Sequence, residues 1–156
     1  MKNAIVFGAT SGIGKSLTEI LVNDGYQVAI TGRRLELLVA LKNKFPNQIL
    51  VKQNDIQDVR DVEKIFHEIV AEFETIDLVI QSSGVGFINP KLEWNQEEQS
   101  INTNVLGVTK LYTLAYILFK NQQFGHLVGI SSIASLRGNR AAPVYFASKA
   151  YQKAYQ

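Results

Sequence analysis

Residues 8–14 read GATSGIG and directly follow the short apolar run AIVF at residues 4–7. Gly8, Gly12 and Gly14 would let the backbone turn sharply and come close to a pyrophosphate. The segment that follows has the pattern of a helix, whose N-terminus would face that anion. Glycine triplets also occur in ordinary turns, so the context matters. A strand, a glycine loop and a helix in this order predict the first unit of a dinucleotide-binding fold.

The rest of the chain alternates short β-branched runs with longer helix-like segments. We expect strands at Ala4-Phe7, Gln27-Thr31, Ile49-Gln53, Leu78-Ser82 and Leu127-Ser131, and helices at Gly12-Asp24, Leu35-Lys44 and Val59-Phe73. Another long helix would begin at Asn95, which Glu98 follows three residues on, and would end at about Phe119. The pattern predicts an α/β fold, a doubly wound parallel sheet of the Rossmann type. Its five strands would lie in the order 3-2-1-4-5, with helices on both faces.

The composition describes one ordinary globular domain spanning residues 1–156, with 46% hydrophobic and 19% charged residues and a net charge of +2. So small a charge predicts no nucleic-acid partner. No run approaches the ~20 apolar residues of a membrane span, and no signal peptide is apparent, so we expect no membrane partner and a cytoplasmic location. Cysteine is absent, and His67 and His126 lack a second ligand at metal spacing, so we predict no metal site.

The second predicted strand leads into two arginines, in ITGRR at residues 30–34. In a dinucleotide fold an acidic residue at this place accepts the ribose 2′-hydroxyl, whereas arginine accommodates a 2′-phosphate. Arg33 and Arg34 also stand at a predicted helix start, where cations are disfavoured unless an anion meets them. They therefore favour NADP(H) over NAD(H). Solvated charges at a helix start are the alternative interpretation.

YFASK, residues 145–149, contains a tyrosine and a lysine four residues apart. On a helix this spacing puts both side chains on one face, so the Lys149 ammonium could lie against the Tyr145 phenol. By chance alone, roughly one such pair is expected in every two chains of this length and composition. A second pair, Tyr116 and Lys120, occurs in YILFK. The spacing therefore does not decide which pair matters.

GATSGIG, Asn104 in NVLG, Ser132 in ISSIAS and YFASK together resemble the short-chain dehydrogenase/reductase family in its compact single-domain form. The resemblance covers the whole chain, but family members usually continue well beyond the lysine. We therefore expect the C-terminal part of the family domain to be absent. A fragment of a longer protein, a truncated gene product and a sheet completed by another chain all fit. The family usually has Asn-Asn-Ala-Gly after the fourth strand, and Gln81-Ser82-Ser83-Gly84 puts the bonding of those amides in doubt.

The resemblance implies a cofactor site and a proton-transfer site. The implied cofactor-binding residues are Gly8, Thr10, Ser11, Gly12, Ile13, Gly14, Arg33, Arg34, Asp55, Ile56, Ser83, Gly84, Tyr145 and Lys149. Tyr145, which lies thirteen residues after Ser132 as in the family, would be the general acid and base, and Tyr116 would be a packing residue. Lys149 would lower the phenol pKa and bond the nicotinamide ribose. Ser132 would hold the substrate oxygen, and Asn104 would bind a water that passes protons to the lysine.

The implied function is hydride transfer between the nicotinamide of NADP(H) and a small-molecule carbonyl or secondary alcohol. A truncated nucleotide-binding or interaction module without catalytic activity is the main alternative. A nucleotide-sugar epimerase or dehydratase, which has the same tyrosine and lysine pair, is the second. Family members are usually dimers or tetramers, and the segment Val105-Phe119 is apolar nearly all round, so we expect a homodimer or homotetramer built on this helix.

Overall fold

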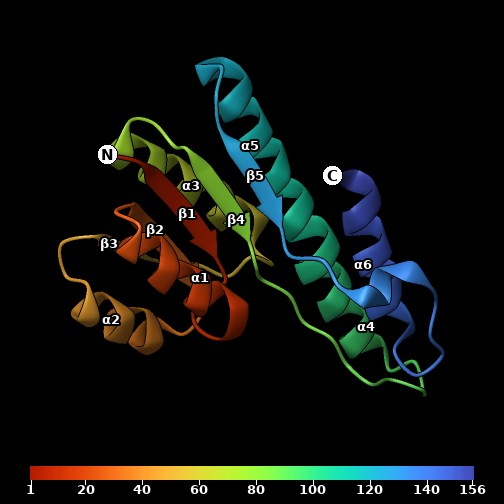
Figure 1. Ribbon diagram of the computed structural model, residues 1–156. Helices are drawn as coiled ribbons and strands as arrows, with labels where there is room; N and C mark the ends of the chain where they lie inside the picture. Colours follow the sequence, from red (N-terminus) through yellow and green to blue (C-terminus); the bar gives the residue numbers. More distant parts are fainter.

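The computed structural model describes all residues from Met1 to Gln156 and contains a five-stranded parallel sheet. The strands are β1 (Asn3–Phe7), β2 (Gln27–Gly32), β3 (Ile49–Gln53), β4 (Leu78–Gln81) and β5 (His126–Gly129). They lie in the order β3-β2-β1-β4-β5 (Figure 1), which confirms the predicted fold class and strand order. The third strand has the predicted ends, whereas the fifth ends at Gly129 and not at Ser131.

The central strand β1 determines where the site lies. It pairs with β2 on one side and with β4 on the other, and Phe7 is aligned with both Thr31 and Gln81. The C-terminal ends of these three strands therefore meet at one edge of the sheet. The strand order reverses between β1 and β4, which is the place where doubly wound folds bind their ligands.

Helices cover both faces of the sheet (Figure 1). They are α1 (Gly12–Asn23), α2 (Leu35–Lys44), α3 (Val59–Phe73), α4 (Trp94–Ile101), α5 (Val108–Gln122) and α6 (Pro143–Tyr155). Side chains of β1 alternate between two cores: Ile5 and Phe7 pack with residues of α3 and α5, and Ala4 and Val6 with residues of α1 and α2. Because both faces of β1 are buried, its residues from Ala4 to Phe7 are all apolar.

The start of α3 shows why one helix boundary was readable from the sequence. The Asp58 side chain accepts hydrogen bonds from the backbone N–H groups of Arg60 (3.0 Å) and Asp61 (3.2 Å). This N-cap satisfies two donors that the first helical turn would otherwise leave unpaired. The predicted bounds of α2 and α3 agree with the structure, and α1 ends one residue earlier than predicted.

The long helix predicted from Asn95 to about Phe119 is wrong in its details. Its first part, α4, begins at Trp94, so Asn95 lies in the first turn and does not cap the helix. A π-helical segment, η1 (Asn102–Gly107), then separates α4 from α5, which continues to Gln122. A π turn holds an extra residue without a break in direction, and such turns are frequent at functional sites. Apolar periodicity does not reveal this insertion because η1, with the sequence NTNVLG, begins with three polar residues.

One face of α5 packs on the sheet, and another face is open. Its buried residues are Val108, Leu111, Tyr112, Leu114 and Ala115. By contrast, Tyr116 is 64% exposed and Ile117 is 50% exposed. Tyr116 was expected to be a packing residue. This expectation is wrong within this chain, because Tyr116 lies on the exposed side of α5. None of the helices combines the length and the apolar character that crossing a bilayer requires.

Candidate active site

A cavity of about 720 Å³ lies over the C-terminal ends of the strands. The glycine loop, the ends of β2 and β3, the segment after β4 and helix α6 all contribute to its wall. The predicted cofactor residues in its lining are Gly8, Thr10, Ser11, Gly12, Ile13, Arg33, Arg34, Asp55, Ile56, Ser83, Gly84, Tyr145 and Lys149. Of the predicted set only Gly14 is outside the lining. The fold thus brings these residues together, and their role in binding a cofactor stays a prediction.

The three glycines of the loop serve different purposes. Gly8 and Gly12 have φ values of 92° and 54°, a left-handed conformation that glycine adopts without strain. A Cβ on Gly12 would meet nothing within 4 Å, so this residue leaves the loop open for a ligand. A Cβ on Gly14 would collide with the carbonyl of Gly8. Gly14 is therefore required by packing of α1 beneath the loop.

The N-terminus of α1 offers donors to an anion. The side chain of Ser11, the N-cap residue, makes no capping hydrogen bond, so it leaves the N–H groups of the first turn unpaired. Arg34 lies over this turn and donates through Nη2 to Thr10 Oγ1 (2.7 Å) and Ser11 Oγ (2.9 Å). The guanidinium of Arg33 has no hydrogen-bond partner in the chain. The two neighbouring arginines therefore differ: Arg34 supports the loop, and Arg33 remains available to a ligand.

The segment after β3 closes another side of the cavity. Asn54 is buried, and its Nδ2 donates to Asp61 Oδ2 on α3 at 2.8 Å. Asp55 and Ile56 follow it in the cavity lining. A Cβ on Gly107 would collide with the backbone carbonyl of Ile56, so the end of η1 packs directly on this segment. The predicted adenine-contacting segment is thereby fixed by both α3 and η1.

The segment after β4 carries the departure from the family motif. Gln81 is fully buried, its Nε2 donates to the carbonyl of Ser83, and its Oε1 has no partner. A Cβ on Gly84 would lie 3.5 Å from both Asn104 Oδ1 and Lys149 Nζ. The glutamine amide therefore bonds to its own segment. Glycine at position 84 keeps the cavity wall open beside Lys149.

Asn104 is fully buried on η1, and its side chain bonds to the neighbouring segments. Its Nδ2 donates to the carbonyl of Val85 (2.7 Å) and to Ser148 Oγ (3.0 Å), and its Oδ1 accepts from the N–H of Val85 (3.0 Å). Its backbone carbonyl accepts from Gln152 Nε2 at 2.8 Å. Asn104 thus joins η1, the segment after β4 and α6. Its predicted binding of a water stays a prediction.

Helix α6 carries Tyr145 and Lys149 into the cavity wall, and its buried residues are all polar. Lys149 is 6% exposed, and its Nζ donates to the Ile130 carbonyl (3.0 Å) and to Gln152 Oε1 (2.9 Å). Burial lowers the pKa of the Lys149 ammonium below the ordinary lysine value. The ring of Tyr145 packs on Gly86, where a Cβ would meet the ring Cδ2 at 2.7 Å. The two side chains share one wall, but no hydrogen bond joins them.

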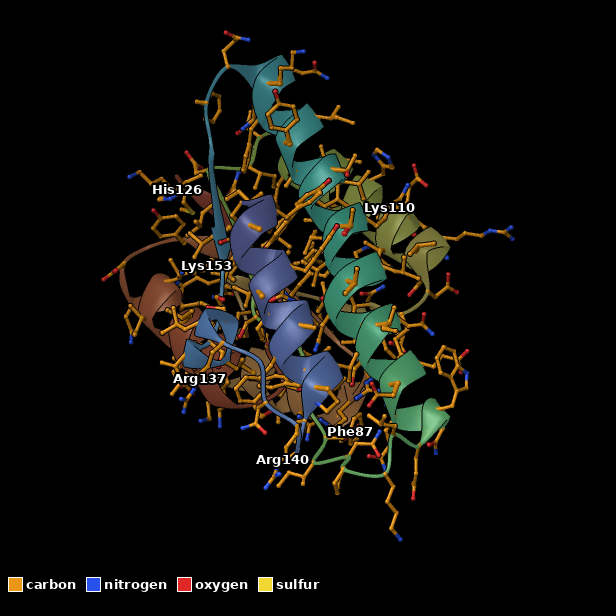
Figure 2. The ribbon with its side chains drawn as sticks, turned by 90° about the vertical axis from the view of Figure 1, so that its right-hand side faces the viewer. Phe87, Lys110, His126, Arg137, Arg140 and Lys153 are labelled. Carbon is orange, nitrogen blue, oxygen red and sulfur yellow. The ribbon has the colours of Figure 1, made fainter.

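Ser132 lies in a second, adjoining cavity of about 510 Å³, which Tyr145 also lines. Its Oγ accepts from the N–H of Ala134 (3.1 Å) and so begins a short 3₁₀ helix, η2 (Ile133–Leu136). The structure thus places Ser132 and Tyr145 at one cavity. Figure 2 shows Phe87, from the wall of the larger cavity, and Arg137, from the smaller one, on opposite sides of the N-terminal half of α6.

Sequence reasoning missed several residues of the site, among them Val85, Ser131 and Gln152. Val85 bonds Asn104 through its backbone, for which no side-chain signal exists. Ser131 lines the larger cavity, and its buried Oγ has no partner. Gln152 bonds both Lys149 and Asn104. Only Gln152 carried a readable signal, since its position three residues after Lys149 puts both side chains on one face of α6.

The comparisons with known proteins agree with this geometry. The family model described as short chain dehydrogenase matches residues 2–155. An uncharacterized oxidoreductase from Staphylococcus saprophyticus is 33% identical over 96% of this chain and 66% of its own length. A 15-hydroxyprostaglandin dehydrogenase [NAD(+)] from Rattus norvegicus is 36% identical over 95% of this chain and 56% of its own length. The chain therefore spans less than two thirds of these relatives.

Among solved structures, the closed form of a serine dehydrogenase complexed with NADP+ is similar to this chain with a TM-score of 0.92. It is 26% identical, and the match covers 98% of this chain and 63% of that chain. The similarity therefore includes nearly all of the elements described above.

Proposed function

Because the chain belongs to the short-chain dehydrogenase family, we propose that it carries the cofactor site and the acid–base residues of an NADP-dependent oxidoreductase. The reaction would transfer a hydride between the nicotinamide and a carbonyl or secondary alcohol. The observation that carries the proposal is the continuous cavity that runs from Gly12 and Arg33 to Tyr145 and Lys149. A phosphate-binding helix end and a proton-transferring side chain in one cavity are what such a reaction requires.

The cavity fits a dinucleotide at the N-terminus of α1. The first turn of α1 has unpaired N–H groups, and the open position of Gly12 allows a pyrophosphate to come close to them. The bound dinucleotide would supply or accept the hydride at its nicotinamide ring.

The preference for NADP(H) rests on the end of β2. Thr31 and Gly32 occupy the place where an acid would accept a ribose 2′-hydroxyl, and Arg33 follows with a guanidinium free of other partners. A planar cation there suits a 2′-phosphate. The names of the relatives do not select one cofactor, because both NAD(+) and NADP+ occur among them.

Proton transfer would fall to Tyr145. Its hydroxyl has no partner in the chain, and its ring lines both cavities, so Oη is available to a substrate oxygen. Lys149 would contribute a positive charge to the same wall of the cavity. Ser132 would orient the substrate oxygen from the second cavity, once its hydroxyl donates to that oxygen while still accepting from Ala134.

We also propose that the chain forms a homodimer or homotetramer through the open face of α5. Leu106, Tyr116 and Ile117 are 52%, 64% and 50% exposed. Leu106 lies on η1, and Tyr116 and Ile117 lie about three turns further along, on α5. Exposed apolar side chains on one helix are typical of a surface that packs against another protein. A second copy of the same helix would bury these side chains around a twofold axis.

Calorimetric titration of the 156-residue chain with NADPH and with NADH tests the cofactor site. We expect NADPH to bind more tightly than NADH. Single-turnover oxidation of bound NADPH by cyclohexanone or benzaldehyde then tests proton transfer, with Tyr145→Phe as the matched control. That variant keeps the aromatic ring in the cavity wall and should lose about 10²–10⁴-fold in rate. A folded chain that binds neither cofactor would favour the non-enzymatic module instead.

A further inference from the structure

Gln152 is 1% exposed and lies on α6 between the side chain of Lys149 and the backbone of Asn104. Its Oε1 accepts from Lys149 Nζ at 2.9 Å, and its Nε2 donates to the Asn104 carbonyl at 2.8 Å. A buried amide costs free energy unless it is paired, and here both ends are paired. Two predicted site residues are therefore joined through one side chain that sequence reasoning did not select.

The chemistry of the two partners fixes the orientation of this amide. An ammonium only donates hydrogen bonds, so the Gln152 atom that faces Lys149 must be the oxygen. A carbonyl only accepts, so the atom that faces Asn104 must be the nitrogen. Both requirements give the same orientation, although oxygen and nitrogen of an amide are otherwise hard to distinguish. A glutamine at position 152 therefore meets two demands that no apolar or singly charged side chain of this size meets.

The hydrogen bonds of Lys149 leave one direction open. Its ammonium has three N–H groups, and the Ile130 carbonyl and Gln152 Oε1 accept from two of them. Lys149 lines the large cavity beside Gly84, where a Cβ would stand 3.5 Å from Nζ. The third N–H is therefore left for the cavity. Its direction follows from where the other two are held.

No carboxylate holds the Lys149 ammonium in place. The ion pairs of the chain join Lys44, Lys52, Lys64 and Lys110 to glutamates, and Lys149 is in none of them. The other titratable residues of α6 are Tyr145, Tyr151, Lys153 and Tyr155, and none of them is a carboxylic acid. Neutral acceptors fix the ammonium without neutralising its charge, so the charge remains available to a ligand.

We propose that Gln152 is a positioning residue, which holds Lys149 and the Asn104 carbonyl in one arrangement so that the third N–H of Lys149 points into the cofactor cavity. The inference deepens the proposed function and rests on it for the identity of the ligand. The arrangement itself rests only on the hydrogen bonds of Gln152 and Lys149. The two can therefore be tested separately.

Two substitutions separate positioning from packing. Gln152→Leu removes both hydrogen bonds at similar volume, so the charged form of Lys149 loses an acceptor and its pKa should fall. Gln152→Glu keeps the acceptor and adds a negative charge, so the pKa of Lys149 should rise. Both variants lose the donor to Asn104 and should be less stable than the native chain. If Gln152 only filled space, the two substitutions would shift the pKa of Lys149 in the same direction, or neither would shift it.

The measurement is a pH titration of lysine ¹³Cε signals by NMR, in which the Lys149 signal is the one missing from the Lys149→Arg spectrum. Opposite shifts in the two variants are the expected result. Equal signs, or no shift in either variant, would overturn the proposal. The native chain gives a further readout: the Gln152 carboxamide protons should exchange slowly with solvent, and fast exchange would also overturn it. This readout decides the matter if neither variant folds.

Cofactor binding adds a test that depends on the proposed function. Gln152→Leu should raise the NADPH Kd about 10-fold, as expected for the loss of one hydrogen bond to a charged group. The matched control is Gln122→Leu, since Gln122 bonds the backbone of Ile76 and Phe124 far from the cavity. It should leave the NADPH Kd unchanged. If the native chain binds no NADPH, the proposed function fails, and the titration still decides the role of Gln152.

Discussion

Two adjacent arginines should contribute to cofactor binding in different ways, and the structure predicts how. The Arg33 guanidinium has no partner in the chain, whereas Arg34 Nη2 bonds Thr10 Oγ1 at 2.7 Å and Ser11 Oγ at 2.9 Å. Arg33→Ala should therefore weaken NADPH binding and leave NADH binding unchanged, because only NADPH has the 2′-phosphate. Arg34→Ala should weaken both, because the glycine loop loses its support on the side of the pyrophosphate.

The magnitude follows from the kind of bond that is lost. Hydrogen bonds to charged groups contribute about 1.5–3 kcal/mol, and an exposed site lies at the lower end because water screens it. We therefore expect Arg33→Ala to raise the NADPH Kd about 10-fold. The loss should shrink at high salt, since ions screen an exposed arginine and phosphate pair.

Calorimetric titration with both cofactors measures the effect, and Arg60→Ala is the matched control. Arg60 is an exposed arginine on α3 outside the cavity lining, so its loss changes the net charge equally. The reasoning is refuted if Arg33→Ala weakens NADH as much as NADPH, or if Arg60→Ala has the same effect as Arg33→Ala.

Three further outcomes follow from the structure. Gly14→Ala should lower the free energy of unfolding by about 1–3 kcal/mol in urea denaturation, because its Cβ meets a backbone carbonyl, whereas Gly138→Ala, with nothing within 4 Å of its Cβ, should be nearly neutral. The pKa of Lys149 is lowered by burial, so the unfolded chain binds more protons, and stability should rise with pH up to the ordinary lysine range. Lys149→Met should abolish that slope in urea titrations at several pH values, and an unchanged slope would refute the assignment. Ile117→Glu should shift sedimentation equilibrium towards the monomer, whereas Ile88→Glu, at an 82% exposed loop position, should not.

The sequence was sufficient for the sheet because each strand is bounded by residues with plain local preferences. The run before Gly8 is buried on both faces, and the Asp58 cap marks the start of α3. The same local logic failed between residues 95 and 119. Nothing in the sequence NTNVLG distinguishes an α turn from the π turn of η1, which depends on contacts with Ile56 and α6.

Only the parts of the site that contain side chains with distinctive chemistry could be predicted from the sequence. Glycines, arginines and the YFASK pair led to the walls of one cavity. The partners of Lys149 were not predictable, because Ile130 contributes a backbone carbonyl and Gln152 is a common residue type. The spacing of Tyr145 and Lys149 suggested a direct contact, but the lysine bonds other acceptors once α6 is docked on η1. Tertiary contacts decide such partners.

The way in which α6 is attached to the rest of the chain predicts how the molecule opens locally. No apolar side chain of α6 is fully buried, and its buried residues are Ser148, Lys149 and Gln152. Its attachment therefore depends on polar contacts and half-buried apolar ones, each of which contributes less than burial of a whole aliphatic side chain. Such an element is expected to detach in a sub-global opening, at a lower free energy than the sheet requires to unfold. In that open form the glycine loop and its arginines would stay folded while the tyrosine and lysine left the wall, so cofactor capture and proton transfer would belong to separate cooperative units.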